Sequence, residues 1–584
     1  MVNRRHFIKY TGLLVPAAPL AACGGGDGIA EVVEWPISST VYTTAEQQIC
    51  PLGLPPDTPP INPADLPYAQ YGYNAWRTQP GLPHEQRLDL APGAAGATPA
   101  ARLLTFFAMS DIHITDKESP AQPLYFGWSA AFGAPSNDGS AYSPVILSTP
   151  QVLDAAVQTI NALHQRTPFD FGISLGDNIN NSQFNELRWF IDVMDGKVII
   201  PSSGAHLGTD RIAYQRPFKA AGLNPAIPWF QVIGNHDQFW MGSWYETPKT
   251  LAAHVGSNVL NMASGPLTAS GGVNDTGFYT GVVDGSSALG VVVKAGPQEN
   301  FANPPQVQAD PDRRSLATAG SSTALWMREF FNTSTLPVGH GFTQDNLQRD
   351  MACYSFQPKA GIPIKVIVLD NTMKGPVNTQ YARACLDQPR LDWLVAELND
   401  GQTNDQLMVV AAHIPIYPQK TLDPASGHYQ LLTAPSVVTD DALLAILHNY
   451  PNLLLWMSGH RHVNVVTPQP FNAANPAEQP ERNFWEVETA SLRDFPQQLR
   501  TFELYRNTDQ TVSIVVTNVD PAVAPGSPAA RSRDYAVGAA RIFDATAQSI
   551  GDASSHAYNA VLVKQLTPRM QEVIAALGSP LHST

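Results

Sequence analysis

Five short polar clusters in this sequence contain side chains of the kinds that bind metal ions, and each cluster directly follows an apolar run. The clusters lie at residues 110–113, 176–178, 234–237, 413 and 458–462. The first contains Asp-x-His and the last contains His-x-His, so each can present two side chains to one region from a turn. Together they offer carboxylate, imidazole and amide groups and no thiolate. This mixed nitrogen and oxygen set favours Zn, Mn, Fe, Co or Ni over an all-oxygen calcium site.

Each cluster taken alone also has an ordinary structural explanation. An aspartate at the end of a strand commonly caps the following helix, and a single histidine is commonly a hydrogen-bonded polar residue. Five clusters in one chain, all placed at strand ends, favour a shared metal site instead. The candidate ligands are Asp111, His113, Asp177, Asn235, His413, His460 and His462.

The elements that would position these clusters alternate along the chain. Strand-like apolar runs, five of which precede the clusters, occupy residues 103–109, 169–175, 227–233, 364–370, 407–412 and 453–457. Helical periodicity between them occupies residues 151–163, 390–398 and 440–448. Alternating strands and helices predict an α/β fold with parallel or mixed sheets, whose functional groups gather at the carboxyl ends of the strands.

The alternation lapses between residues 238 and 350, where Gly- and Ser-rich sequence indicates a long insertion. Beyond it, residues 501–505 and 511–516 alternate in polarity like the edge strands of a second sheet. Helical patterns at residues 534–546 and 561–577 end the sequence.

The first residues are typical of an export signal. Arg4 and Arg5, followed by Phe-Ile-Lys, resemble a twin-arginine signal, and the Leu-Ala-Ala-Cys that ends at Cys23 resembles a bacterial lipobox. These features predict a periplasmic or cell-surface lipoprotein that contacts a membrane through a lipid anchor at Cys23. The alternative is an ordinary signal peptide followed by a chance cysteine.

Length and composition limit the remaining possibilities. The chain has 584 residues, 43% of them hydrophobic, which is ample for a buried core, and its net charge of −15 argues against binding a nucleic-acid polymer. Cys353 and Cys385 could form a disulfide, but the sequence does not show whether the two residues approach each other. We expect a signal peptide at 1–22, an extended N-terminal arm at 23–100, one domain at 101–520 and a C-terminal helical extension at 521–584.

The order of the motifs resembles that of the calcineurin-like metallophosphoesterases. Their signature runs Asp-x-His, Gly-Asp, Gly-Asn-His-Asp/Glu, His and Gly-His-x-His, and every part of it is present between residues 103 and 494. Residues 185–189 and 488–496 are similar to an exported, long-insert branch of that family, which has no settled substrate. The resemblance implies a four-layer αββα sandwich of two mixed β-sheets flanked by helices.

The resemblance also implies a role for each candidate residue. The implied ligands of one divalent transition-metal ion are Asp111, His113, Asp177 and His462. Those of a second ion are Asp177, Asn235, His413 and His460, with Asp177 bridging and taking part in catalysis. A hydroxide held between the ions would attack phosphorus, while His236 would stabilise or protonate the leaving oxygen. Many members carry an aspartate where this chain has Asn180, and an amide cannot raise the basicity of the His236 imidazole as a carboxylate would.

The expected activity is hydrolysis of a phosphate ester, either a small molecule or derived from a lipid. A slight preference for diesters rests on the resemblance to members that begin with Asp-x-His. The alternatives are a phosphomonoesterase or nucleotidase, and a surface-binding lipoprotein that keeps the metal fold without turnover. No cofactor other than the two metal ions is implied.

Weaker candidates each have two interpretations. The aromatic residues in 240–245 either wall a substrate pocket or pack the insertion on the core. Arg313 and Arg314 either hold a second phosphate or lie in a solvated loop. His340 and His428 are further histidines that approach the site only if the fold brings them there.

Overall fold

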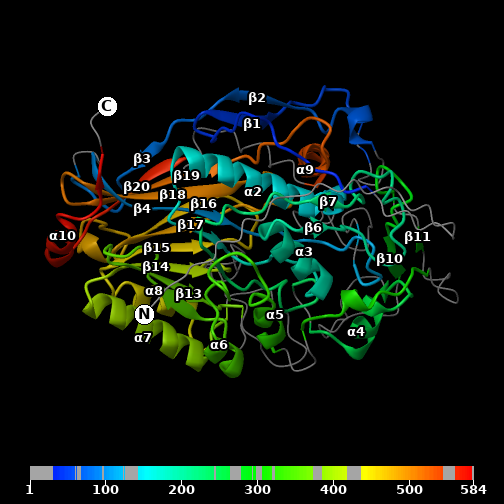
Figure 1. Ribbon diagram of the computed structural model, residues 1–584. Helices are drawn as coiled ribbons and strands as arrows, with labels where there is room; N and C mark the ends of the chain where they lie inside the picture. The colour runs from blue at the N-terminus through cyan, green and yellow to red at the C-terminus, as the bar shows by residue number, and fades with distance from the viewer. Residues whose placement is uncertain are drawn as a thin grey trace, which may run out of the picture.

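Two β-sheets lie face to face between layers of helices in the computed structural model (Figure 1). This is the four-layer α/β sandwich expected from the sequence. The structure describes residues 31–59, 61, 67–94, 98–122, 124, 143–242, 245–262, 278–291, 294–296, 306–317, 322–372, 385–416, 436–543 and 559–581.

One sheet has six strands and carries the last two polar clusters. Its strands, in spatial order, are β12 (Tyr354–Phe356), β13 (Ile364–Leu369), β14 (Leu407–Ala412), β15 (Leu453–Ser458), β17 (Phe484–Glu488) and β16 (Val465–Gln469). The four inner strands run parallel, and β12 and β16 are antiparallel to their neighbours. The crossovers contain α7 (Gln388–Thr403) and α8 (Asp440–Leu447), as the sequence periodicity predicts.

The other sheet carries the first three clusters. Its strands, in spatial order, are β3 (Glu85–Arg87), β20 (Ala560–Lys564), β19 (Val512–Val519), β18 (Leu499–Asn507), β4 (Pro99–Met109), β5 (Phe171–Ser174) and β8 (Trp229–Gln231), with β21 (Ser579–Pro580) beside β4. Strands β4, β5 and β8 are parallel, and their crossovers contain α2 (Thr149–Arg166) and α3 (Phe184–Met194). Helix α3 is not among the predicted helices.

The inner strands of the six-stranded sheet are buried on both faces. Val366 of β13 belongs to the apolar core that also contains Phe502 of the facing sheet. Its neighbour Ile367 belongs to a second core with Leu394 of α7. Successive side chains of a strand point to opposite faces, so this pattern places the sheet between its partner sheet and the helices below it in Figure 1.

The prediction that residues 501–505 and 511–516 form edge strands is wrong. Strand β18 lies between β4 and β19, and β19 lies between β18 and β20. Polar positions that suggested an exposed edge find partners inside the protein. The Asn507 Nδ2 donates to Ser513 Oγ at 2.7 Å, and both residues are fully buried. At Asn507 and Ser513 the polar side chains are therefore buried polar groups with hydrogen-bond partners.

The predicted helix over residues 561–577 is also wrong in its first half. Residues Ala560–Lys564 form β20, which pairs with β19, and the helix begins only after Thr567, as α10 (Pro568–Ile574). Two β-branched valines in the short β20 favour a strand. The expected C-terminal helical extension therefore supplies a strand to the main sheet, although its first predicted helix is present as α9 (Pro528–Phe543).

The described part of the N-terminal arm packs on the body of the protein. Its hairpin consists of β1 (Gln47–Pro51) and β2 (Trp76–Pro80). The Trp76 Nε1 donates to Asp534 Oδ1 of α9 at 2.8 Å, and Tyr68 is only 1% exposed. These contacts dock the described part of the arm on the body of the protein.

The predicted insertion at 238–350 contains short elements and buries part of itself in the core. The short helices and strands of the insertion include α4 (Pro248–Val255), β9 (Asn261–Met262), β10 (Phe278–Val282), β11 (Lys294–Gly296), α5 (Ala324–Glu329) and α6 (Gln344–Arg349). Trp326 and Phe330 belong to the large apolar core. A smaller two-stranded sheet, β6 (Val198–Ile199) with β7 (Phe218–Lys219), precedes the insertion.

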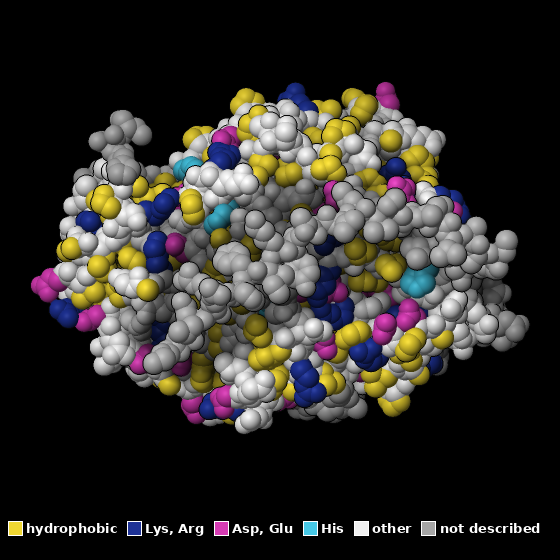
Figure 2. Space-filling model, in the orientation of Figure 1, with side chains coloured by type: hydrophobic (Ala, Val, Ile, Leu, Met, Phe, Trp, Pro, Cys, Tyr) yellow, Lys and Arg dark blue, Asp and Glu magenta, His cyan; other side chains and the backbone are white. Residues whose placement is uncertain are grey.

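Figure 2 shows basic and acidic side chains interspersed over the face in view, so the acidic excess is not gathered into one field there. Hydrophobic side chains on that face are scattered among them. Within the described ranges, no helix combines the length and the apolarity that crossing a membrane requires.

Candidate metal centre

The carboxyl ends of five parallel strands converge and bring the predicted ligands together. The first two ligands follow β4, one follows each of β5, β8 and β14, and the last two follow β15. Two groups form around potential metal positions, with the ligand atoms of each group within 4.8 Å of one another. One group is Asp111, His113 and His462, and the other is Asp177, His413 and His460.

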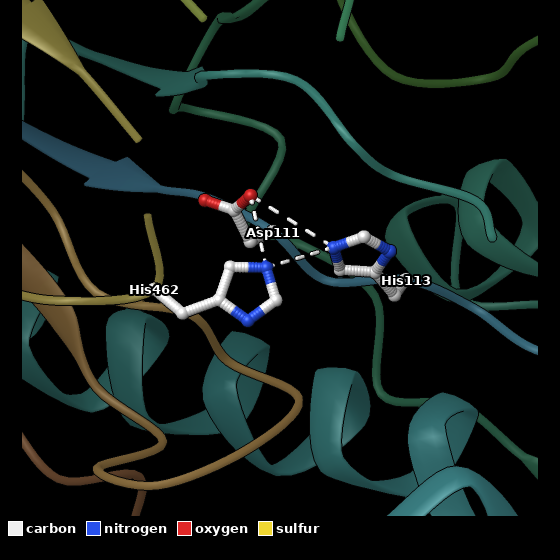
Figure 3. Close-up of side chains that lie close together, drawn as sticks. All are labelled: Asp111, His113 and His462. Atoms are coloured by element: carbon white, nitrogen blue, oxygen red, sulfur yellow. Dashed lines mark hydrogen bonds and ion pairs between the residues drawn. The ribbon is translucent and has the colours of Figure 1, made fainter. Parts of the chain in front are cut away.

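The first group is shown in Figure 3. The Nε2 atoms of His113 and His462 are 3.1 Å apart. The Asp111 Oδ1 lies 3.4 Å from His462 Nε2 and 3.8 Å from His113 Nε2. Two imidazole nitrogens and a carboxylate oxygen therefore face one small region.

The second group includes the amide of the third motif. The Asn235 Oδ1 lies 2.9 Å from His413 Nε2 and 3.0 Å from His460 Nδ1. Its own Nδ2 donates to the carbonyl of Gly242 at 3.0 Å, which turns the amide oxygen toward the histidines. All four predicted donors of this second position thus lie together once Asp177 is added.

Asp177 stands between the two groups. Its Oδ2 lies 3.2 Å from His413 Nε2 and 3.6 Å from His113 Nε2. Its Oδ1 accepts the backbone N–H of His236 at 2.8 Å, so the carboxylate is held in place. A bridging role needs one carboxylate close to both groups, and this geometry provides it. The role itself stays a prediction.

The ligand-bearing turns adopt strained backbone conformations. Left-handed φ values occur at Asp111 (51°), His113 (46°), Asp177 (53°), His460 (73°) and His462 (58°). Such values cost non-glycine residues about 1–3 kcal/mol each and persist only where the surrounding structure imposes them. Five of them at one place indicate that the fold holds these side chains in position.

Two motif glycines allow the turns to approach closely. A Cβ on Gly459 would collide with Ser110 Oγ and with Asp111 Oδ2. A Cβ on Gly234 would collide with Asp177 Oδ1. The glycines of Gly-His-x-His and Gly-Asn-His-Asp are therefore required by the spacing of the candidate ligands.

Two histidines are oriented by partners behind them. The His462 Nδ1 lies 2.8 Å from Asp494 Oδ1, and the His413 Nδ1 lies 2.9 Å from the Leu175 carbonyl. Bonds of this kind fix the ring so that Nε2 faces the centre. Asp494 is not among the predicted site residues. Its only sequence signal is its place in the 488–496 run, which does not indicate what it contacts.

Asp237 connects the turn that bears Asp177 to the turn that bears Asn235. Its carboxylate accepts the backbone N–H groups of Gly234 at 2.7 Å, Asp177 at 2.9 Å and Asn178 at 3.1 Å. Burial and the neighbouring Asp177 raise the pKa of Asp237 well above its usual value. The residue thus positions the second and third motifs relative to each other.

Charge is distributed unevenly among the donors. Burial alone would raise the pKa of Asp111, but His462 and His113 hold that pKa well below its usual value. Burial lowers the pKa of His113 and that of His460 to about 3 each. Burial lowers the pKa of His413, but the attraction of Asp177 and Asp111 and the hydrogen bonds of the ring together outweigh burial and raise that pKa to about 9.

The donor set fits a metal. The Asp111 Oδ1 is buried and makes no hydrogen bond to any residue in the described part of the chain. A buried carboxylate oxygen without a hydrogen bond is costly, and a cation among these donors would remove that cost. Two compact groups of imidazole, carboxylate and amide ligands suit two divalent transition-metal ions.

His236 lies beside the centre, in a third close group with His113 and Asp177. Its Nδ1 is 2.8 Å from the backbone carbonyl of Asn180. A carbonyl only accepts, so Nδ1 carries the hydrogen and Nε2 is the nitrogen left for chemistry. The side chain of Asn180 bonds elsewhere, and its Oδ1 accepts from Arg493 Nη1 at 2.5 Å. The backbone therefore supplies the partner that an aspartate was expected to supply.

Several weaker candidates belong to the interior. Arg313 is 1% exposed, and its Nε lies 3.2 Å from Asp116 Oδ2, so the solvated-loop interpretation is wrong for it. The ring of His340 stacks on Trp229 at 3.5 Å and is fully buried, so it does not join the candidate ligands. Trp240 is fully buried, which favours packing.

The remaining candidates from the sequence are Arg314, the two cysteines and His428. Arg314 places its guanidinium 3.5 Å from the centroid of the Phe184 ring. Cys353 and Cys385 are both buried and are not joined by a disulfide. His428 lies outside the described residues, as does the predicted signal peptide at 1–22.

Comparison with known proteins finds similarity among solved structures. No protein-family model matches the sequence, and no curated protein matches it. A dimetal phosphatase from Danio rerio is 12% identical, and the match covers 72% of this chain and 97% of that chain with a TM-score of 0.33. The metal centre is therefore inferred from the geometry of the chain's own side chains.

Proposed function

We propose that this protein is a hydrolase of phosphate esters that uses two divalent transition-metal ions. The observation that carries this proposal is the position of Asp177, whose Oδ2 lies 3.2 Å from a histidine of one ligand group and 3.6 Å from a histidine of the other. Two ligand groups that share a carboxylate match the requirement of a two-metal hydrolase.

Each residue of the centre has a role in this proposal. When bound, two divalent ions polarise the phosphoryl oxygens and lower the pKa of a water molecule. One ion would be held by Asp111, His113, His462 and the shared Asp177. The other would be held by Asp177, Asn235, His413 and His460. Asp494 and the Leu175 carbonyl would keep the imidazoles of His462 and His413 in their binding orientation.

His236 would assist departure of the alcohol. Its Nδ1–H donates to the Asn180 carbonyl, which leaves Nε2 to hold a proton for the leaving oxygen. Burial lowers the pKa of His236, so the protonated ring gives up its proton more readily than a solvated histidine does.

Purified, metal-loaded protein assayed on aryl phosphate monoesters and diesters tests this function. Faster hydrolysis of diesters supports the preference that the Asp-x-His motif suggests, and faster hydrolysis of monoesters assigns a phosphomonoesterase or nucleotidase. His236→Ala is the matched variant and should lower turnover while keeping its metals. Hydrolysis of neither ester with both metals bound would indicate a binding lipoprotein.

We also propose export by the twin-arginine route and a lipid anchor at Cys23, on the strength of the motifs in residues 1–23. Such an enzyme would meet small or lipid-derived phosphate esters outside the cytoplasm. Replacing Arg4 and Arg5 by lysine should retain the precursor inside the cell. Cys23→Ala should abolish lipid labelling, and normal labelling of that variant would contradict the anchor.

A further inference from the structure

The segment after β17 connects to several of the site's turns through different side chains. The Ser491 Oγ donates to the backbone carbonyl of Asp111 at 2.7 Å. Asp494 accepts from a candidate ligand, as described above. Between them, Arg493 Nη1 donates to Asn180 Oδ1 at 2.5 Å. Ser491 and Asp494 thus contact candidate metal ligands. Arg493 contacts Asn180, whose backbone carbonyl is the partner of His236.

Asn180 is held by each of its polar groups. Its side-chain Nδ2 donates to Gln122 Oε1 at 2.8 Å, and its backbone N–H donates to Glu186 Oε2 at 3.1 Å. Its Oδ1 accepts from Arg493, and its carbonyl lies 2.8 Å from His236 Nδ1. An amide side chain can accept and donate at once, whereas a carboxylate could not donate to Gln122. The Asn180 side chain therefore donates to one partner and accepts from another at the same time.

We propose that Arg493 is a positioning residue for His236, acting by fixing Asn180 and thereby the carbonyl that orients the imidazole. The chain of contacts runs from the guanidinium to the Asn180 side chain and from the Asn180 backbone to the ring. The inference rests on the proposed role of His236 in assisting the leaving group.

Burial of Arg493 supports a role beyond packing. The side chain is 1% exposed, and moving a guanidinium out of water is costly. An apolar side chain of similar length would fill the same space at a lower cost. A planar donor that meets an amide oxygen at short range fixes the direction of that amide, and a methionine cannot do so.

The test combines Arg493→Met with His236→Ala in metal-loaded enzyme. Two aryl phosphate esters serve as substrates, one with a good leaving group and one with a poor leaving group. We expect Arg493→Met to lower kcat about tenfold or more for the poor leaving group, less for the good one, with KM and metal content little changed. In the His236→Ala background the same substitution should change kcat less than about twofold, because a positioning residue then has nothing to position.

Two further variants keep the test decisive if Arg493→Met folds poorly. Asn180→Ala breaks the same contact from its other end and should reproduce the dependence on the leaving group. Arg493→Lys keeps the charge without the planar geometry and should recover part of the rate.

Three outcomes would overturn the proposal. A raised KM for both esters that persists in the His236→Ala background would mean that Arg493 binds substrate directly. Equal losses for both leaving groups would mean a general structural role. Loss of metal would mean that Arg493 supports the metal-bearing turns.

A measurement without turnover separates this inference from the proposed function. Exchange of the His236 Nδ1 proton, followed by NMR with nitrogen-labelled histidine, should be slow in the wild-type protein and at least several-fold faster in Arg493→Met. Arg314→Met is the control and should leave the exchange unchanged. A wild-type protein that hydrolyses neither ester would defeat the proposed function, whereas unchanged exchange in Arg493→Met would defeat the positioning role.

Discussion

His462 and Asp494 form a close pair at the edge of the candidate centre, with 2.8 Å between the Nδ1 of one and the Oδ1 of the other. The opposite ring nitrogen lies 3.4 Å from Asp111 Oδ1. Burial alone would lower the pKa of His462, but Asp494 and Asp111 raise it well above its usual value. Asp494 therefore both orients the ring and makes it more electron-rich as a ligand.

Asp494→Asn should weaken metal binding about 10- to 100-fold, because an amide orients the ring less strongly and carries no charge. Competition with a chelator of known affinity measures the effect. Asp312→Asn is the control, since its side chain is 66% exposed on the insertion. Equal affinities in the two variants would contradict the orienting role.

Gly459→Ala should displace the turn that bears His460 and His462, because its Cβ would collide with Ser110 Oγ and Asp111 Oδ2. We expect the variant to fold and to bind less than one equivalent of metal per chain. Gly53→Ala serves as the control, since its Cβ would meet nothing within 4 Å. Full metal content in Gly459→Ala would show that the turn accommodates the added Cβ without displacing its histidines.

Arg313→Met should reduce the free energy of unfolding by about 3–5 kcal/mol, because it leaves the buried charge of Asp116 without its partner. Chemical denaturation of the metal-loaded protein measures the loss. Arg314→Met is the neighbouring control, and its half-exposed side chain should contribute less than about 1 kcal/mol. Similar losses in both would contradict a buried ion pair that anchors the insertion.

His340 should make the protein less stable as the pH falls. Burial lowers the pKa of His340 from 6.5 to about 4, so between these values the unfolded chain takes up a proton that the folded protein does not. This contributes nothing above pH 6.5 and removes up to about 3 kcal/mol as the pH falls to 4.

His340→Asn should flatten the decline in melting temperature between pH 6.5 and 4. Asparagine tolerates the left-handed φ of 45° at this position. His206→Asn is the control, because His206 has a similar φ of 49° and is exposed. A decline as steep as that of the wild-type protein would show that another group causes it.

The strands that carry the motifs could be predicted because their burial on both faces leaves continuous apolar runs. Residues 407–412, for example, coincide with β14. Strand β20 is not predicted, because its five residues lie shortly before a helix and merge with the helical pattern. Short strands of this kind depend on the neighbours that they pair with, which a local pattern does not contain.

The candidate ligands could be predicted because each motif is local. The partners of His236 and of His462 could not. Arg493 and Asn180 are 313 residues apart, and His462 and Asp494 are 32 residues apart. Contacts at such separations follow from the packing of the two sheets, and an arginine or aspartate in a loop carries no sign of its partner.

Metal content of the Asp177→Asn variant tests the central claim most directly. We expect wild-type protein and His236→Ala to bind two equivalents of a divalent transition metal per chain by elemental analysis after removal of excess ion. Asp177→Asn should bind clearly less than two, because both ligand groups lose the carboxylate that they share. Two full equivalents in Asp177→Asn would contradict a centre built around a bridging Asp177.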